Sequence, residues 1–242
     1  MAVATLSVNV SPVHQRRLRE IWRSAGWPCQ DLIEAELLAA GLLERVRHGS
    51  GHETLRVTDA GVAVLAGTLQ RNRARREAHE ALVERVAREM TRAGRMAWRG
   101  LALRAHVDES ADGGAGRWVM ALPDVFSIRH TTVEDWLEPA AHEIKVTRAD
   151  LLSDLRHPHK RHAYLAMSSQ CWYVLKEGIA EPGELPPEFG VMFACADGTL
   201  DVARPAPKRA LRLPLATWMA LARTNAEPGL DGEAQAWLRD AA

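Results

Sequence analysis

The sequence of 242 residues has few cysteines and no long apolar run. Its three cysteines, Cys29, Cys171 and Cys195, form no Cys-x-x-Cys pair, so we expect neither a disulfide framework nor a cysteine zinc site. No stretch of eighteen apolar residues is present, so we expect no transmembrane helix. The first twelve residues lack the basic segment that opens a signal peptide. Together these absences predict a cytoplasmic protein without a membrane partner.

Lysine is also scarce. The chain has only four lysines, Lys145, Lys160, Lys176 and Lys208, against 27 arginines. A GC-rich genome favours arginine codons, so this bias alone does not indicate nucleic-acid binding. It does make each remaining lysine a candidate for a specific chemical role.

The overall composition is that of a globular protein, with 47% hydrophobic and 26% charged residues. The length allows one large domain or two small ones, and the net charge of zero averages two unequal halves. Residues 1–95 carry 15 arginines and 11 acidic residues, whereas residues 96–242 carry 16 basic and 20 acidic residues. This asymmetry favours two domains with different tasks.

Two helical patterns begin the chain. Pro12 stands where proline favours a first helical turn, and Leu18, Ile21 and Trp22 follow on what we expect to be one apolar face. Helical spacing resumes over residues 29–40, and the glycine that follows is a typical helix stop.

A β-hairpin and a third helix follow. Segments 42–47 and 53–57 flank the turn-forming sequence His-Gly-Ser-Gly, which predicts a hairpin. Thr58 is a candidate N-cap for a helix that reaches at least Leu69. The order of helix, helix, hairpin and helix over residues 11–70 resembles a winged helix-turn-helix domain.

The second helix of this domain is acidic, which is unusual for a recognition helix in a DNA groove. It carries Asp31, Glu34 and Glu36 and no basic residue. The hairpin instead carries the basic residues Arg45, Arg47 and Arg56. We therefore expect one of two roles. Either these arginines contact DNA through the wing, or the domain is a module for a protein partner or a homodimer.

The second half of the chain alternates helices and strands. A helical pattern runs from Glu77 to about Thr91. Strand-like segments cover residues 96–104, 117–122, 125–128, 140–146, 171–175, 191–194 and 200–203. A capping box opens a helix over residues 147–167, with a break near Pro158. This order predicts an α/β sandwich. The predicted domains are 1–76, which includes a linker helix, 77–205, and a C-terminal helical extension over 206–242 with short helices over 213–222 and 234–238.

Two acidic residues and a lysine form the candidate reactive group. Glu143 and Lys145 stand two residues apart on a predicted strand, so their side chains share one face. If Asp124 lies on the adjacent strand, its carboxylate joins them. Hard oxygen ligands of this kind hold Mg²⁺ or Mn²⁺, and the ion would polarise a phosphate and acidify a water molecule.

Four sequence blocks extend this pattern in a fixed order: PDVFSI, HEIKVTRADLLSD, KRHAYLAM and CWYVLKEGIAEPGELPPEFGVMFACADG. Over about residues 77–205 they resemble the PD-(D/E)xK nuclease superfamily, and within it the branch of the MmcB-like DNA repair proteins. The resemblance implies a restriction-endonuclease-like α/β sandwich behind an N-terminal winged-helix domain. It also implies Mg²⁺-dependent (or Mn²⁺-dependent) hydrolysis of DNA.

The resemblance assigns roles to individual residues. Asp124 and Glu143 would be metal ligands, with the Ile144 carbonyl as a third, and Lys145 would be the catalytic lysine. Many superfamily members add a glutamate from the first helix.

Here either His79, which faces the sheet, takes that place as a supporting catalytic residue, or Glu80 reaches round from the edge of the helix. Lys160 and Tyr164 stand one helical turn apart and are candidates for supporting phosphate or active-site geometry. Arg148 and Lys160 are candidate DNA contacts in this domain.

The sequence therefore predicts a metal-dependent DNA nuclease acting in DNA repair, mobile-element processing or defence. The alternative is a catalytically silent DNA-binding or adaptor protein on the same fold. A ligand-sensing transcription regulator is a third possibility, for the first domain alone. Decayed nucleases usually lose the lysine or one acid, and Asp124, Glu143 and Lys145 are all present here, which favours the enzyme.

Overall fold

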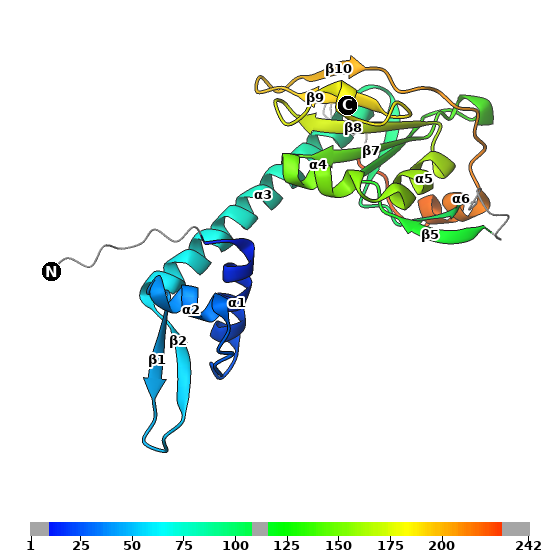
Figure 1. Ribbon diagram of the computed structural model, residues 1–242. Coiled ribbons are helices and arrows are strands. Elements are labelled where there is room, and N and C mark those ends of the chain that lie inside the picture. The colour runs from blue at the N-terminus through cyan, green and yellow to red at the C-terminus, as the bar shows by residue number, and fades with distance from the viewer. Residues whose placement is uncertain (1–9, 108–115, 229–242) are drawn as a thin grey trace, which may run out of the picture. The chain divides into compact units, whose positions relative to one another are not determined.

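The computed structural model describes residues 10–107 and 116–228, a mixed α/β chain (Figure 1). It divides into two compact units between Ala74 and Arg75, two residues before the boundary predicted from the sequence. Among the helices of the described ranges, none is long and apolar enough to cross a membrane.

The first unit contains two short helices and a hairpin, followed by the beginning of a long helix. Its elements are α1 (Pro12–Arg23), α2 (Leu32–Ala39), β1 (Leu43–Arg47), β2 (Glu53–Val57) and the start of α3 (Asp59–Arg92). The predicted hairpin is confirmed. Helix α2 begins three residues later than predicted, because Asp31 is its N-cap and Gln30 has a positive φ of 55°.

One expectation for α1 is wrong. The buried stripe of this helix consists of His14, Leu18 and Ile21, spaced four and three residues apart. Trp22 lies one position beyond that stripe and is 60% exposed, so it does not belong to the core of this unit.

Helix α3 is continuous over 34 residues, where the sequence predicted two separate helices. The intervening segment 70–76 contains arginine, alanine, glutamine and asparagine but no glycine or proline. Nothing in it interrupts helical hydrogen bonding, and arginine and alanine favour the helix. The helix therefore begins in the first unit and ends in the second.

The second unit contains a sheet of six strands. In spatial order they are β10 (Leu200–Arg204), β9 (Gly190–Ala194), β8 (Gln170–Lys176), β7 (Ala140–Lys145), β6 (Val125–Arg129) and β3 (Arg95–Arg99). The strands β7, β8 and β9 are parallel, and the remaining neighbours are antiparallel.

A separate hairpin of β4 (Leu103–Val107) and β5 (Arg117–Ala121) lies between β3 and β6 in the sequence. The sequence predicted a single strand over 96–104. The structure divides it into β3 and β4, because Gly100 has a φ of 59° and turns the backbone out of the extended conformation.

Helices cover both faces of the sheet. The α3 face is packed by Leu82, Val83 and Val86 against Val125 and Ile144. The other face is covered by the β4–β5 hairpin together with three helices and is the larger core. These helices are α4 (Arg148–Leu155), α5 (Pro158–Met167) and α6 (Leu215–Ala222). Two short 3-10 helices, η1 (Glu134–Trp136) and η2 (Pro182–Glu184), complete the unit.

The C-terminal segment is not a separate extension as far as the structure describes it. Ala206, Leu213 and Leu221 are buried in the two cores of the second unit. Glu227 accepts a hydrogen bond from Arg99 at 2.6 Å. The helix predicted over 234–238 lies outside the described residues.

Close packing between β8 and β9 gives a test of this fold. Gly190 lies opposite Trp172, and a β-carbon there would come within 2.4 Å of the indole atom Cε3 and 2.7 Å of the Ala206 nitrogen. We expect Gly190→Ala to lower the free energy of unfolding by about 1–3 kcal/mol. Gly183→Ala is the matched control, because a β-carbon at Gly183 meets nothing within 4 Å. Urea titrations of both variants would measure the difference, and equal stabilities would contradict this packing.

Candidate active site

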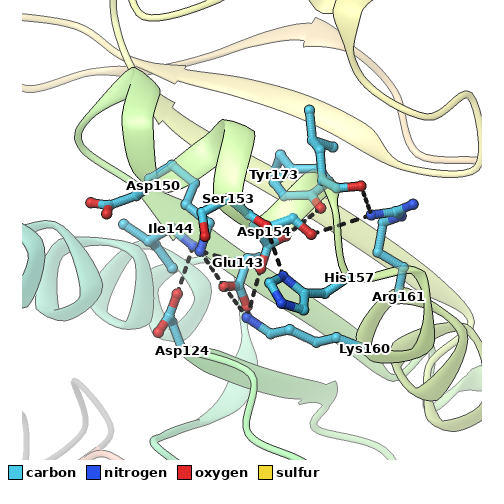
Figure 2. Close-up of polar contacts among 12 residues, drawn as sticks. Asp124, Glu143, Ile144, Asp150, Ser153, Asp154, His157, Lys160, Arg161 and Tyr173 are labelled. Atoms are coloured by element: carbon cyan, nitrogen blue, oxygen red, sulfur yellow. Dashed lines mark hydrogen bonds and ion pairs between the residues drawn. The ribbon is translucent and has the colours of Figure 1, made fainter.

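The pairing of β6 with β7 brings Asp124 next to the acidic end of β7. Val125 pairs with His142 in this antiparallel pair, so the preceding residue, Asp124, lies beside Glu143. The Asp124 carboxylate accepts a hydrogen bond of 2.7 Å from the backbone N–H of Ile144 (Figure 2). The structure thus places the two predicted acids at one end of neighbouring strands.

Glu143 is the most enclosed acid of this group, with a side chain that is only 3% exposed. Its Oε1 atom accepts hydrogen bonds from Lys145 Nζ and from Lys160 Nζ, both at 2.5 Å. Its Oε2 atom lies 2.7 Å from the hydroxyl of Tyr164. Both carboxylate oxygens of Glu143 therefore have protein donors.

Asp154 is a third buried acid, at the end of α4. Its Oδ1 atom accepts a hydrogen bond of 2.9 Å from Lys160 and lies 3.6 Å from Lys145 Nζ. Its Oδ2 atom accepts a hydrogen bond of 2.7 Å from the hydroxyl of Tyr173 on β8. Figure 2 shows these side chains converging between β7 and the two helices that follow it.

We call Glu143, Asp154, Lys145 and Lys160 the charged cluster. Its two carboxylates and two ammonium groups balance, so it carries no net formal charge. Balanced pairing makes burial of these four charges possible, because an unpaired charge in the interior costs several kcal/mol.

The pKa values of Asp154 and Lys160 follow from this pairing. Burial alone would raise the pKa of Asp154, but the lysine charges and the Tyr173 hydrogen bond outweigh it and lower the pKa. Burial likewise opposes ionisation of Lys160, yet its acidic partners raise its pKa. Burial raises the pKa of Tyr164 and of Tyr173, which keeps both hydroxyls protonated and able to donate.

Helix ends hold the second half of the cluster in place. The Thr147 side chain caps α4 by accepting from the Asp150 backbone, and α4 carries Asp154 in its last turn. Pro158 in the first turn of α5 begins the new helix and brings Lys160 back toward β7. Arg161 joins the two helices by donating to the Leu155 carbonyl at 2.8 Å.

His79 lies beside Asp124 on the α3 side. Its Nε2 atom is 3.5 Å from the Asp124 carboxylate, and hydrogen bonding to that carboxylate raises the pKa of His79. Glu80 lies 3.6 Å from the other ring nitrogen, and its side chain is 67% exposed. Of the two alternatives on this helix, the histidine is thus the one in contact with Asp124.

His79 lines two surface pockets. One of about 400 Å³ is lined by Glu80, Arg99 and Asp124 among others, and one of about 360 Å³ is lined by Lys145, Asp154 and Lys160 among others. Both lie within the second unit.

The oxygen atoms at this end of β6 and β7 suit a hard cation. The oxygens of Asp124 and Glu143 and the Ile144 carbonyl are the ligands that Mg²⁺ prefers. Within the described residues, no group of three histidine, cysteine, aspartate or glutamate side chains is arranged to hold a metal. A cation at Glu143 would share that carboxylate with Lys145, Lys160 and Tyr164, which already donate to it.

The predicted DNA contacts are ion-paired within the chain. Arg47 and Arg56 in the first unit pair with hairpin glutamates at 2.6 Å, and Arg45 lies within 3.6 Å of Glu34 and Glu53. Arg148 forms a two-point pair with Glu184. Lys160 is 36% exposed and pairs with Glu143 and Asp154 of the charged cluster.

Sequence reasoning brought Lys160 and Tyr164 together but missed Asp154 and Tyr173. Asp154 is the last acid of the HEIKVTRADLLSD block, so its signal was present in the motif that carried the resemblance. Tyr173 is paired in register with Glu143 on the parallel strand β8. Only knowledge of that register identifies it.

Comparisons with known proteins add little to this geometry. No family model and no curated protein matches the chain. A solved structure of a protein of unknown function from Silicibacter pomeroyi is similar, with 21% sequence identity and a TM-score of 0.38. The match covers 65% of this chain and 86% of that one.

The lowered pKa of Asp154 predicts a pH-dependent stability. We expect Asp154→Asn to lower the free energy of unfolding by about 3 kcal/mol at pH 7, because it leaves the buried lysines undercompensated. The folded-state pKa lies below the ordinary value of 3.8, so this stabilisation is complete above that value. It is lost as the pH falls through the lowered pKa.

Urea unfolding at pH 7, 5, 3 and 2 would measure the difference between wild type and variant. Asp201→Asn on the exposed edge strand β10 is the control and should have little effect at any pH. A difference that stays constant down to pH 2 would show that Asp154 is not stabilised by its charge.

Proposed function

We propose that the second unit is a metal-dependent DNA nuclease with a restriction-endonuclease-like core, and that the first unit is a winged-helix module for DNA or a protein partner. The observation that carries this proposal is the meeting of Asp124, Glu143 and Lys145 at one end of β6 and β7. Repair, mobile-element processing and defence are the processes in which such an enzyme would act.

In this proposal four side chains of the site have definite tasks. Bound by Asp124, Glu143 and the Ile144 carbonyl, Mg²⁺ or Mn²⁺ would supply Lewis-acid activation of the phosphate and of a water molecule. The Lys145 ammonium stabilises negative charge that develops on the phosphate or orients the attacking water. Tyr164 holds the Glu143 carboxylate in one orientation through its hydroxyl.

One observation favours the catalytically silent alternative. Both oxygens of Glu143 accept from protein donors, and the charged cluster is neutral without a cation. A protein that only binds DNA would keep such a cluster as internal ion pairing. The two candidates differ in whether a divalent cation changes the chemistry of the site.

Cleavage assays separate them. Purified protein would be incubated with labelled linear, circular and branched DNA in Mg²⁺, Mn²⁺ or EDTA. We expect cutting that needs the metal, and a loss of at least about 100-fold in Lys145→Ala, the scale for losing one positioned charge. Glu143→Gln should lose activity to a similar degree.

Lys176→Ala is the matched control, since Lys176 lies on the adjacent strand one residue beyond the partner of Lys145 and is exposed. DNA affinity in Ca²⁺ should change little in all three variants. If the wild type binds DNA but cuts no substrate in either metal, and Lys145→Ala behaves identically, the protein is a binding or adaptor protein.

A further inference from the structure

One face of the β4–β5 hairpin is exposed to solvent and carries several large apolar side chains. On its inner side Leu103, Ala105 and Ala121 are buried in the core. The alternation of a strand places its other residues outward. We call these the outer hairpin face: Arg104, His106, Trp118, Met120 and Leu122. The last three are 54%, 54% and 56% exposed, so large apolar side chains lie on the outer side of β5 and at the residue that follows it.

Basic and aromatic groups are combined on this face. The Arg104 guanidinium lies 5.4 Å from the centre of the Trp118 ring. His106 is the pairing partner of Trp118 and meets its ring edge-on at 5.3 Å. Neither strand contains an acidic residue. The acids between the strands, in segment 108–115, lie outside the described residues.

The outer hairpin face ends at the candidate active site. The Leu122 carbonyl lies 2.9 Å from the Tyr164 hydroxyl and shares its single proton with Glu143, which lies 2.7 Å from the same hydroxyl. Asp124 follows Leu122 by two residues. From Trp118 to Leu122 the strand spans about 13 Å, the length of roughly four stacked nucleotides.

We propose that the outer hairpin face binds unpaired bases of the DNA substrate and leads that strand to the charged cluster; this inference rests on the proposed nuclease function. An exposed indole offers a stacking surface to any base, and single-strand binding sites combine such rings with basic groups. Met120 and Leu122 are the kind of apolar side chains that insert between base steps and partly unstack them. The substrate class is therefore single-stranded DNA or a junction between duplex and single strand.

The test measures binding by the full chain in EDTA, so that no cutting is needed. Fluorescence anisotropy would compare a labelled 20-nucleotide single strand with a blunt duplex of the same length. We expect Trp118→Ala to weaken single-strand binding about tenfold and duplex binding less than twofold. Trp118→Phe keeps an aromatic ring and should stay within about threefold of wild type.

Trp136→Ala is the matched control, because Trp136 is 63% exposed in η1, at the opposite end of β6 and β7 from the site. A second measurement covers the case in which Trp118→Ala misfolds or the first unit dominates affinity. A single strand carrying 5-iododeoxyuridine would be photo-crosslinked to the wild type, and the attached peptide identified by mass spectrometry. We expect the crosslink within residues 117–122.

Each outcome decides the matter. Unchanged single-strand affinity in Trp118→Ala, with crosslinks only elsewhere, overturns the inference even if the wild type cuts DNA. Weaker single-strand binding in Trp118→Ala, together with a wild type that cuts nothing, supports the binding face and overturns the nuclease function. A change from oligomer to monomer in Trp118→Ala, with DNA affinity unchanged, shows that this face joins copies of the chain and also overturns the inference.

Discussion

The buried carboxylate of Glu143 is the constraint on which the second unit depends. A charge that is 3% exposed needs partners from its surroundings, and Glu143 takes them from its own strand and from α5. Lys160 also donates to one carboxylate oxygen of Asp154, and the Tyr173 hydroxyl on β8 donates to the other. One buried charge thus fixes the positions of α4 and α5 against the parallel strands.

The same constraint explains why structure and chemistry are difficult to separate here. Groups that balance a buried acid are also those that would handle a phosphate: ammonium ions, a phenol and a second carboxylate. The proposed nuclease would use this balance in its resting state, and a silent descendant would keep it for stability. The reaction of the site to a divalent cation is the property in which the two differ.

The sequence predicted the local parts of this arrangement because they depend on short spacings. Glu143 and Lys145 share a face through strand alternation, the helix expected over 147–167 is interrupted near Pro158 as predicted, and the hairpin turn lies at Gly-Ser-Gly. The partners of Asp154 escaped prediction. The contact between Asp154 and Tyr173 needs the register of β8, which no local pattern contains.

The errors had local causes as well. Gly100 divides a strand because its φ is positive, a property that a glycine in a strand pattern does not reveal by itself. Helix α3 continues through the basic segment 70–76, which has no stop signal. The sequence predicted a domain boundary at the end of that segment. Trp22 was placed by hydrophobicity, although the buried stripe of α1 passes one position away.

The hydrogen bond from Ile144 to Asp124 has a consequence for the backbone itself. Extending the register of β6 and β7 places Pro123 opposite Ile144, but Pro123 lies outside β6, which begins at Val125. The Asp124 side chain takes the Ile144 N–H in place of a neighbouring strand. Whatever draws this carboxylate away also frees that amide. The exchange rate of one backbone proton therefore reports directly on the state of the acid.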